Sequence, residues 1–95
     1  MTSREFIIDA KRFDRRTLTE VQHKLRTLLK CYTVTGFVFT EGRNFKFKKS
    51  YMIRGARLND SKEYEGFYNI EDAGEGKYKL SLTVVGVVQE QSNNG

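Results

Sequence analysis

The chain has no proline, one cysteine and one histidine among its 95 residues. A single cysteine excludes a disulfide scaffold and a zinc finger of ordinary ligand spacing. No apolar run approaches the roughly 20 residues that cross a membrane as a helix. The sequence also lacks a glycine-rich phosphate loop, a nucleophile elbow and an HExxH-type run, so it carries no familiar catalytic motif. We therefore expect no enzyme, no cofactor, no metal site and no membrane partner, and a cytoplasmic location.

The length and composition favour one small domain. Hydrophobic residues make up 38% of the chain and charged residues 31%, which is typical of a globular protein rather than a disordered one. Residues 1–88 form the predicted domain. Residues 89–95 contain no apolar side chain, and we expect them to be a disordered polar tail.

The net charge of +5 conceals an uneven distribution. Residues 1–57 carry 14 basic and five acidic side chains, a net charge of +9. Residues 58–95 carry three basic and seven acidic ones, a net charge of −4. Such asymmetry suggests an anionic partner for the basic part, either nucleic acid or an acidic protein surface.

The periodicity of the apolar residues predicts an α+β fold. The 3- and 4-residue spacing from Leu18 to Tyr32 predicts a helix over about residues 17–31, with a capping box at residues 17–20. Alternating patterns predict strands at residues 5–10, 33–39, 45–54, 63–70 and 77–88. One helix in the N-terminal half then packs on an antiparallel sheet of about five strands, in the order β-α-β-β-β-β, as a two-layer sandwich.

Residues 43–57 carry the strongest signal for a binding site. This segment holds six basic residues and no acidic one, namely Arg43, Lys46, Lys48, Lys49, Arg54 and Arg57. Lysine and arginine supply most of the non-specific affinity for nucleic acid through phosphate contacts. Strand alternation directs Phe45 and Phe47 away from Lys46 and Lys48, so these rings cannot stack on a base held by those lysines. The alternative is an ordinary amphipathic strand with a solvated basic face.

A second basic cluster precedes the predicted helix and consists of Lys11, Arg12, Arg15 and Arg16. The N-terminal end of a helix carries partial positive charge, so a bound anion would stabilise basic residues placed there. The alternative is that these side chains are simply solvated. His23 has no evident acidic or nucleophilic neighbour, and we do not expect it to be catalytic.

The strand predicted over residues 63–70 offers a protein-binding alternative. Its aromatic residues point both ways, so Tyr64 or Phe67 could lie exposed beside Glu65 on an acidic surface. Residues 84–88 are uncharged and suit either a central strand or a sheet edge that pairs with a second copy as a homodimer.

Three functions fit these features. The first is a small non-catalytic nucleic-acid-binding protein that contacts the phosphate backbone with the basic hairpin and the helix-start cluster. The second is an inhibitor or adaptor, of the kind that phages encode, which binds a host protein. The third comes from a resemblance: residues 66–70 and 80–84, with the size and element order, resemble the RelE-type toxins, which implies a small ribonuclease. One predicted helix stands where that family has two and residues 64–70 contain no arginine, so no catalytic residue carries over.

Overall fold

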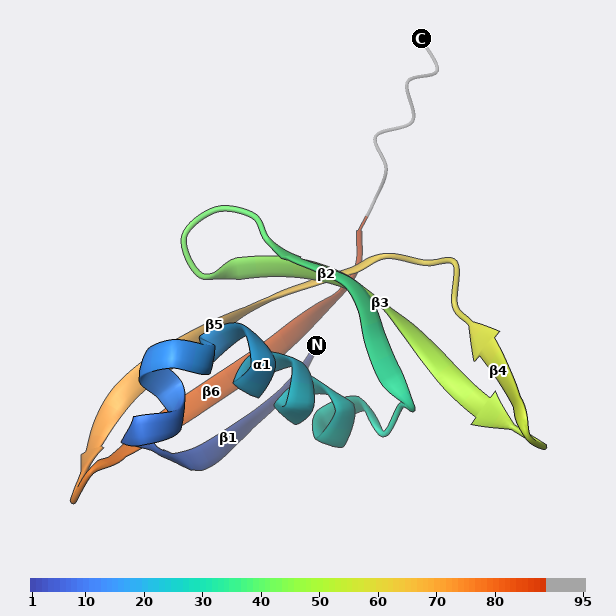
Figure 1. Ribbon diagram of the computed structural model, residues 1–95. Helices are drawn as coiled ribbons and strands as arrows, with labels where there is room; N and C mark the ends of the chain where they lie inside the picture. Colours follow the sequence, from blue (N-terminus) through green and yellow to red (C-terminus); the bar gives the residue numbers. More distant parts are fainter. Residues whose placement is uncertain (89–95) are drawn as a thin grey trace, which may run out of the picture.

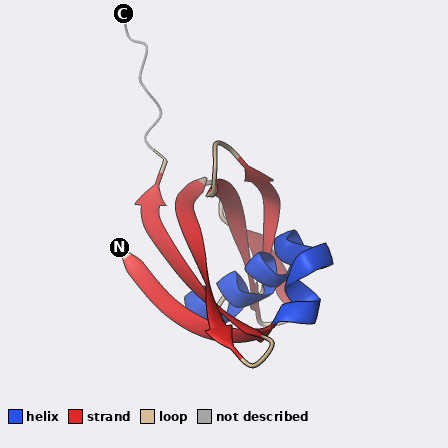
Figure 2. Ribbon diagram, turned by 90° about the vertical axis from the view of Figure 1, so that its left-hand side faces the viewer, coloured by secondary structure: helices blue, strands red, loops and turns tan. Residues whose placement is uncertain are grey.

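The computed structural model describes residues 1–88, and for residues 10–18 it describes the backbone alone. The predicted tail, residues 89–95, lies outside the described residues. The elements in chain order are β1 (Thr2–Asp9), α1 (Ala10–Leu29), β2 (Thr33–Phe39), β3 (Asn44–Ile53), β4 (Ala56–Asn59), β5 (Tyr64–Gly74) and β6 (Lys77–Val87). Within this part of the chain, one helix packs on one side of a twisted antiparallel sheet (Figure 1; Figure 2). The predicted α+β fold with two layers is confirmed.

The sheet follows the order β1-β6-β5-β3-β2, and β4 pairs with β3 beside this path. β3 therefore has two partners on one flank: residues 44–47 pair with β5, and residues 50–53 pair with β4. β6 lies between β1 and β5, with Val84 paired on both sides. The register of β1 ends at Val84, so among the described residues only β5 pairs with the last part of β6. Residues 84–88 carry no charge, and only the first of them, Val84, therefore occupies a central position in the sheet.

The count of six strands corrects the prediction of about five, because β4 was missed. Residues 56–59 alternate between apolar and polar over only four positions, which is too short a pattern to predict a strand, and all four side chains are exposed. β4 forms because a two-residue turn folds it back onto β3. Arg54 and Gly55 both have positive φ values, 51° and 80°, as a type I′ hairpin turn requires.

The start of α1 is a second correction. The helix begins at Ala10, directly after β1, rather than near Thr17. The predicted capping box therefore lies inside the helix. Lysine and arginine are good helix formers, and residues 10–16 contain neither glycine nor proline to stop the helix. The basic run is consequently helical rather than a connection.

The core fills the space between α1 and the sheet. Val21 and Leu25 of α1 are fully buried, which confirms the predicted apolar face of the helix. The sheet contributes the buried side chains of Ile8, Val34, Phe45, Phe47, Leu80, Leu82 and Val84. Both phenylalanines of β3 are therefore core residues, as the amphipathic-strand interpretation predicts.

Gly66 allows the closest approach in the sheet. It pairs with Phe45 on β3 and Val84 on β6, beside a bulge in β5–β6 pairing. A Cβ atom at Gly66 would collide with the carbonyl oxygen of Thr83 and would lie 2.9 Å from a ring carbon of Phe45. The absence of a side chain here lets the Phe45 ring occupy the core.

We expect Gly66→Ala to lower the free energy of unfolding by at least about 3 kcal/mol, because backbone and a buried ring must both move. Urea denaturation measures the change. Gly42→Ala is the matched control: Gly42 has φ of 60° and open space around it, so only the left-handed strain of about 1 kcal/mol applies. Equal losses in the two variants would contradict a close-packing role for Gly66.

Candidate nucleic-acid interface

The sheet face opposite α1 is the candidate interface. Directly paired residues of antiparallel strands lie on the same face, and residues alternate between faces along each strand. Phe45 and Phe47 point to the helix, so Lys46 and Lys48 point away from it. Phe67 pairs with Asn44, and Glu65 pairs with Lys46, which places all four on this helix-free face. The structure thus brings together an aromatic ring and lysines that lie about 20 residues apart in the sequence.

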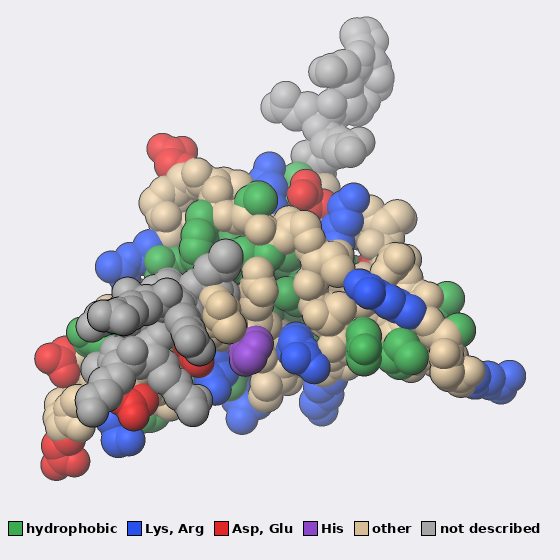
Figure 3. All heavy atoms as spheres, viewed as in Figure 1, with side chains coloured by type: hydrophobic (Ala, Val, Ile, Leu, Met, Phe, Trp, Pro, Cys, Tyr) green, Lys and Arg blue, Asp and Glu red, His purple; other side chains and the backbone are tan. Residues whose placement is uncertain are grey.

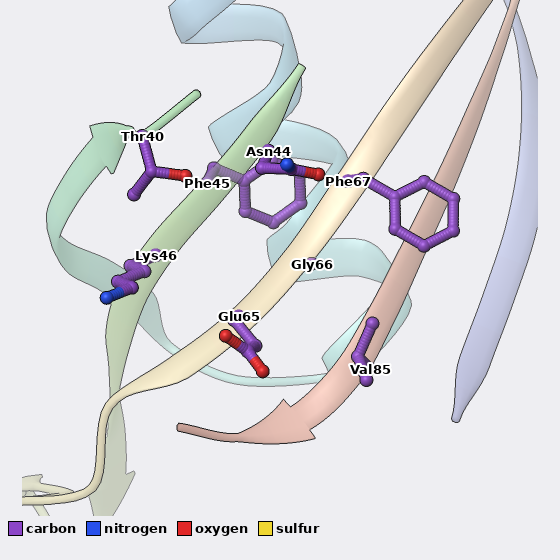
Figure 4. Close-up of a pocket in the computed structure, with 8 residues that line it drawn as sticks. All are labelled: Thr40, Asn44, Phe45, Lys46, Glu65, Gly66, Phe67 and Val85. Atoms are coloured by element: carbon purple, nitrogen blue, oxygen red, sulfur yellow. The ribbon is translucent and has the colours of Figure 1, made fainter. Parts of the chain in front are cut away.

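Phe67 borders a shallow hollow on this face. The hollow has a volume of about 270 Å³. Its lining, shown in Figure 4, consists of Thr40, Asn44, Phe45, Lys46, Glu65, Gly66, Phe67 and Val85. Phe67 is 42% exposed. The volume falls below the roughly 300–1,000 Å³ of ordinary ligand pockets, so the hollow suits one flat group rather than an enclosed substrate.

Polar side chains and Val85 surround Phe67. Its partner on β6 is Thr83, whose hydroxyl lies 3.0 Å from the Ser3 hydroxyl on β1. Asn69 follows on the same face of β5 and accepts a hydrogen bond of 3.1 Å from the Arg43 guanidinium. Because these polar groups are short, the Phe67 ring stays exposed to solvent. The same groups offer both hydrogen-bond donors and acceptors.

The charges on the helix-free face divide into two zones. Near β1, the Lys79 ammonium lies 3.4 Å from a Glu5 carboxylate oxygen and 3.2 Å from one of Glu71. Hydrogen bonding to Glu71 and the charge of Glu5 hold the pKa of Lys79 above its ordinary value. On β3, by contrast, Lys46 and Lys48 form no ion pair with any described residue. The available positive charge therefore lies along β3.

The other basic residues of the hairpin do not share this arrangement. Arg57 on β4 pairs with Met52 and lines a hollow with Arg26, Tyr32 and Thr33 at the C-terminal end of α1. Arg54 lies in the turn between β3 and β4, farther along the hairpin than Lys46 and Lys48. Arg43 lies at the β2–β3 turn, with its guanidinium carbon 5.6 Å from the centre of the Tyr68 ring. The six basic residues thus do not form one patch.

Lys49 lies on the helix side of β3 among aromatic and acidic groups. Its ammonium is 4.3 Å from the centre of the Tyr64 ring and 5.4 Å from that of Tyr51. Burial lowers the pKa of Lys49, but hydrogen bonding to the two tyrosine hydroxyls outweighs it and raises the pKa overall. Tyr64 donates a hydrogen bond of 2.7 Å to Asp60. That bond lowers the pKa of Asp60 and, together with burial, raises the pKa of Tyr64.

The remaining predicted site residues fall elsewhere. Lys11, Arg12, Arg15 and Arg16 belong to the first turns of α1, and their side chains lie outside the described residues. The protein-binding patch of Tyr64, Glu65 and Phe67 is divided, because Tyr64 points to the helix side while the other two point away. Phe67 is absent from the predicted nucleic-acid set, although it lies on the same face as Lys46 and Lys48.

Other chemistry has little support in the described part of the chain. Its acidic, cysteine and histidine residues form no cluster of three that could hold a metal ion. None of its helices is long and apolar enough to span a membrane. His23 is exposed on α1, in the layer opposite Phe67, and lines an open hollow with Lys24, Arg26, Thr27 and Cys31 (Figure 3). Burial raises the pKa of the Cys31 thiol, which opposes a reactive thiolate.

Comparison with protein families, with curated proteins and with solved structures finds no match to this chain.

We expect Tyr64→Phe to raise the pKa of Asp60, because the substitution removes the hydroxyl that donates to the carboxylate. A carboxylate whose folded pKa is depressed adds stability above its unfolded pKa of about 3.9, and this stability is lost as the pH falls through the folded value. The variant should therefore lose less stability on acidification than the unmodified protein does. An NMR titration of the Asp60 carboxyl carbon measures the shift. Tyr51→Phe is the control and should leave Asp60 unchanged.

Proposed function

We propose that this protein is a small, non-catalytic nucleic-acid-binding protein that holds a single strand on its helix-free sheet face. The observation that carries the proposal is that the exposed Phe67, paired with Asn44, lies on the same sheet face as Lys46 and Lys48. Aromatic platforms bordered by cations are the usual means of binding unpaired bases. Ribonuclease activity and binding of a partner protein stay predictions.

Phe67 supplies the stacking surface in this proposal. A base lying on the ring would cover the hollow and meet Asn44, whose amide can both donate and accept hydrogen bonds. Stacking contributes about 1–3 kcal/mol per base, whichever base is present. The interface therefore has affinity for single strands with modest sequence preference.

Lys46 and Lys48 supply phosphate contacts. They are two residues apart on one strand, so their Cα atoms are about 6.6 Å apart and can serve neighbouring positions of a backbone. Glu65 lies opposite Lys46, but an exposed pair of this kind is worth less than about 1 kcal/mol. Glu65 therefore weakens the positive electrostatic field of Lys46 and Lys48 without neutralising it.

The width of the face favours a single strand over a duplex groove. Five strands lie side by side in the path β1-β6-β5-β3-β2. At about 4.8 Å between neighbours they span about 19 Å, whereas the major groove is about 12 Å wide. The helix-start cluster belongs to α1 on the other side of the sheet and has no part in this interface.

We expect Phe67→Leu to weaken the binding of a single-stranded oligonucleotide of about 12 nucleotides by about tenfold, because leucine keeps the apolar contact but has no face for stacking. Fluorescence anisotropy with DNA and RNA versions measures the affinity. Phe39→Leu is the matched control, since Phe39 is 39% exposed but contacts Tyr68 on the helix side. If Phe67→Leu binds as tightly as the unmodified protein, the stacking role is wrong.

We expect the double substitution Lys46→Gln, Lys48→Gln to make the salt dependence of single-strand binding shallower. Each lost phosphate contact changes the slope of log K against log[salt] by about 0.7, so two change it by about 1.4. Lys77→Gln removes a charge from the far end of β6 and is the control. An unchanged slope in the double variant would move the phosphate contacts away from β3.

A further inference from the structure

The paired residues 50–59 form an arm that extends beyond the body of the sheet. In the described part of the chain, β4 pairs with β3 alone, and both strands project past the end of α1 (Figure 1). The arm ends in the tight turn at Arg54 and Gly55. It is a two-stranded ribbon joined directly to the strand that carries Lys46 and Lys48.

The arm exposes apolar side chains at both faces near its tip. Met52 is 46% exposed, Ile53 50% and Leu58 49%. Water-exposed apolar side chains concentrated on one projecting element indicate a surface that a partner covers. The same element carries Arg54 and Arg57, and residues 51–59 contain no acidic side chain. A partner of the arm must therefore combine negative charge with an apolar surface.

A duplex end adjoining the bound single strand meets both requirements. Its phosphates are anionic, and the face of its last base pair is apolar and flat. Apolar side chains such as isoleucine, leucine and methionine act as wedges at base steps in DNA-bending proteins, with arginine beside them. A two-stranded ribbon also fits a major groove, which the wide sheet face does not.

The position of the arm links it to the proposed interface. Met52 lies four residues beyond Lys48 on β3, about 13 Å along the strand, and Arg57 is its partner on β4. A strand that crosses Phe67, Lys46 and Lys48 would therefore reach the arm next. We infer that the preferred ligand is a junction at which a single strand leaves a duplex, with the arm holding the duplex end. This inference rests on the proposed function.

The test compares three DNA probes by fluorescence anisotropy. They are a single strand of about 12 nucleotides, the same strand extending from a duplex, and the blunt duplex alone. We expect the unmodified protein to bind the junction about tenfold more tightly than either of the others, as one or two added contacts would give.

Two arm variants separate charge from apolar contact. Arg54→Asn with Arg57→Gln removes both charges, and asparagine before Gly55 favours the same turn, so the hairpin persists. Met52→Thr with Ile53→Thr removes the wedge and keeps β-forming residues. Each pair should reduce the junction preference to about onefold and change single-strand affinity by less than about twofold. Arg4→Gln with Lys77→Gln removes equal charge from β1 and β6, at the other edge of the sheet, and should leave the preference intact.

The outcomes separate the two proposals. Equal affinity for junction and single strand, or arm variants that bind the junction as well as the unmodified protein, would overturn the inference and make the arm a contact for protein. The Phe67 experiment would then still support the sheet face. Loss of all single-strand binding, or insensitivity to Phe67→Leu, would overturn the proposed function and the inference with it.

Discussion

The contact between the Phe45 ring and Gly66 is the constraint on which the arrangement of both faces depends. A side chain at position 66 would occupy the space of that ring and of the Thr83 carbonyl group. The pairing of β5 with β3 is therefore held in one register. A slip of one residue would exchange the faces of every side chain on β5. Phe67 would then point into the core, and the platform beside Lys46 would not exist.

The same constraint explains how a domain of this size leaves one sheet face open. The core is a single layer in which Val21 and Leu25 of α1 meet Phe45, Phe47 and Leu82 of the sheet. One helix covers one face, and the other carries charged and polar side chains together with the exposed apolar side chains of Ile7, Val38 and Val85. A solvated face of this kind is ordinary for antiparallel sheets. What distinguishes it here is the half-exposed phenylalanine at its centre.

The charge asymmetry of the chain does not survive folding as two opposed sides. Lys79 from the acidic part pairs with Glu5 from the basic part, because β1 and β6 are neighbours. Lys49 faces the helix side and contacts tyrosines, while Lys46 and Lys48 face the other way. The counts of +9 and −4 therefore indicated that a basic surface exists. The pairing of strands decided that its open part is a short row along β3.

The sequence by itself determined the fold class, the apolar stripe of α1 and the burial of Phe45 and Phe47, because these follow from periods of 3.6 and 2 within single segments. Only the tertiary structure decided that β4 exists, since its pairing with β3 rather than its own pattern makes it a strand. The placement of Phe67 on the same face as Lys46 was likewise undetermined. It depends on which residues of β3 and β5 are paired, and that register is set by a contact between distant segments, at Gly66.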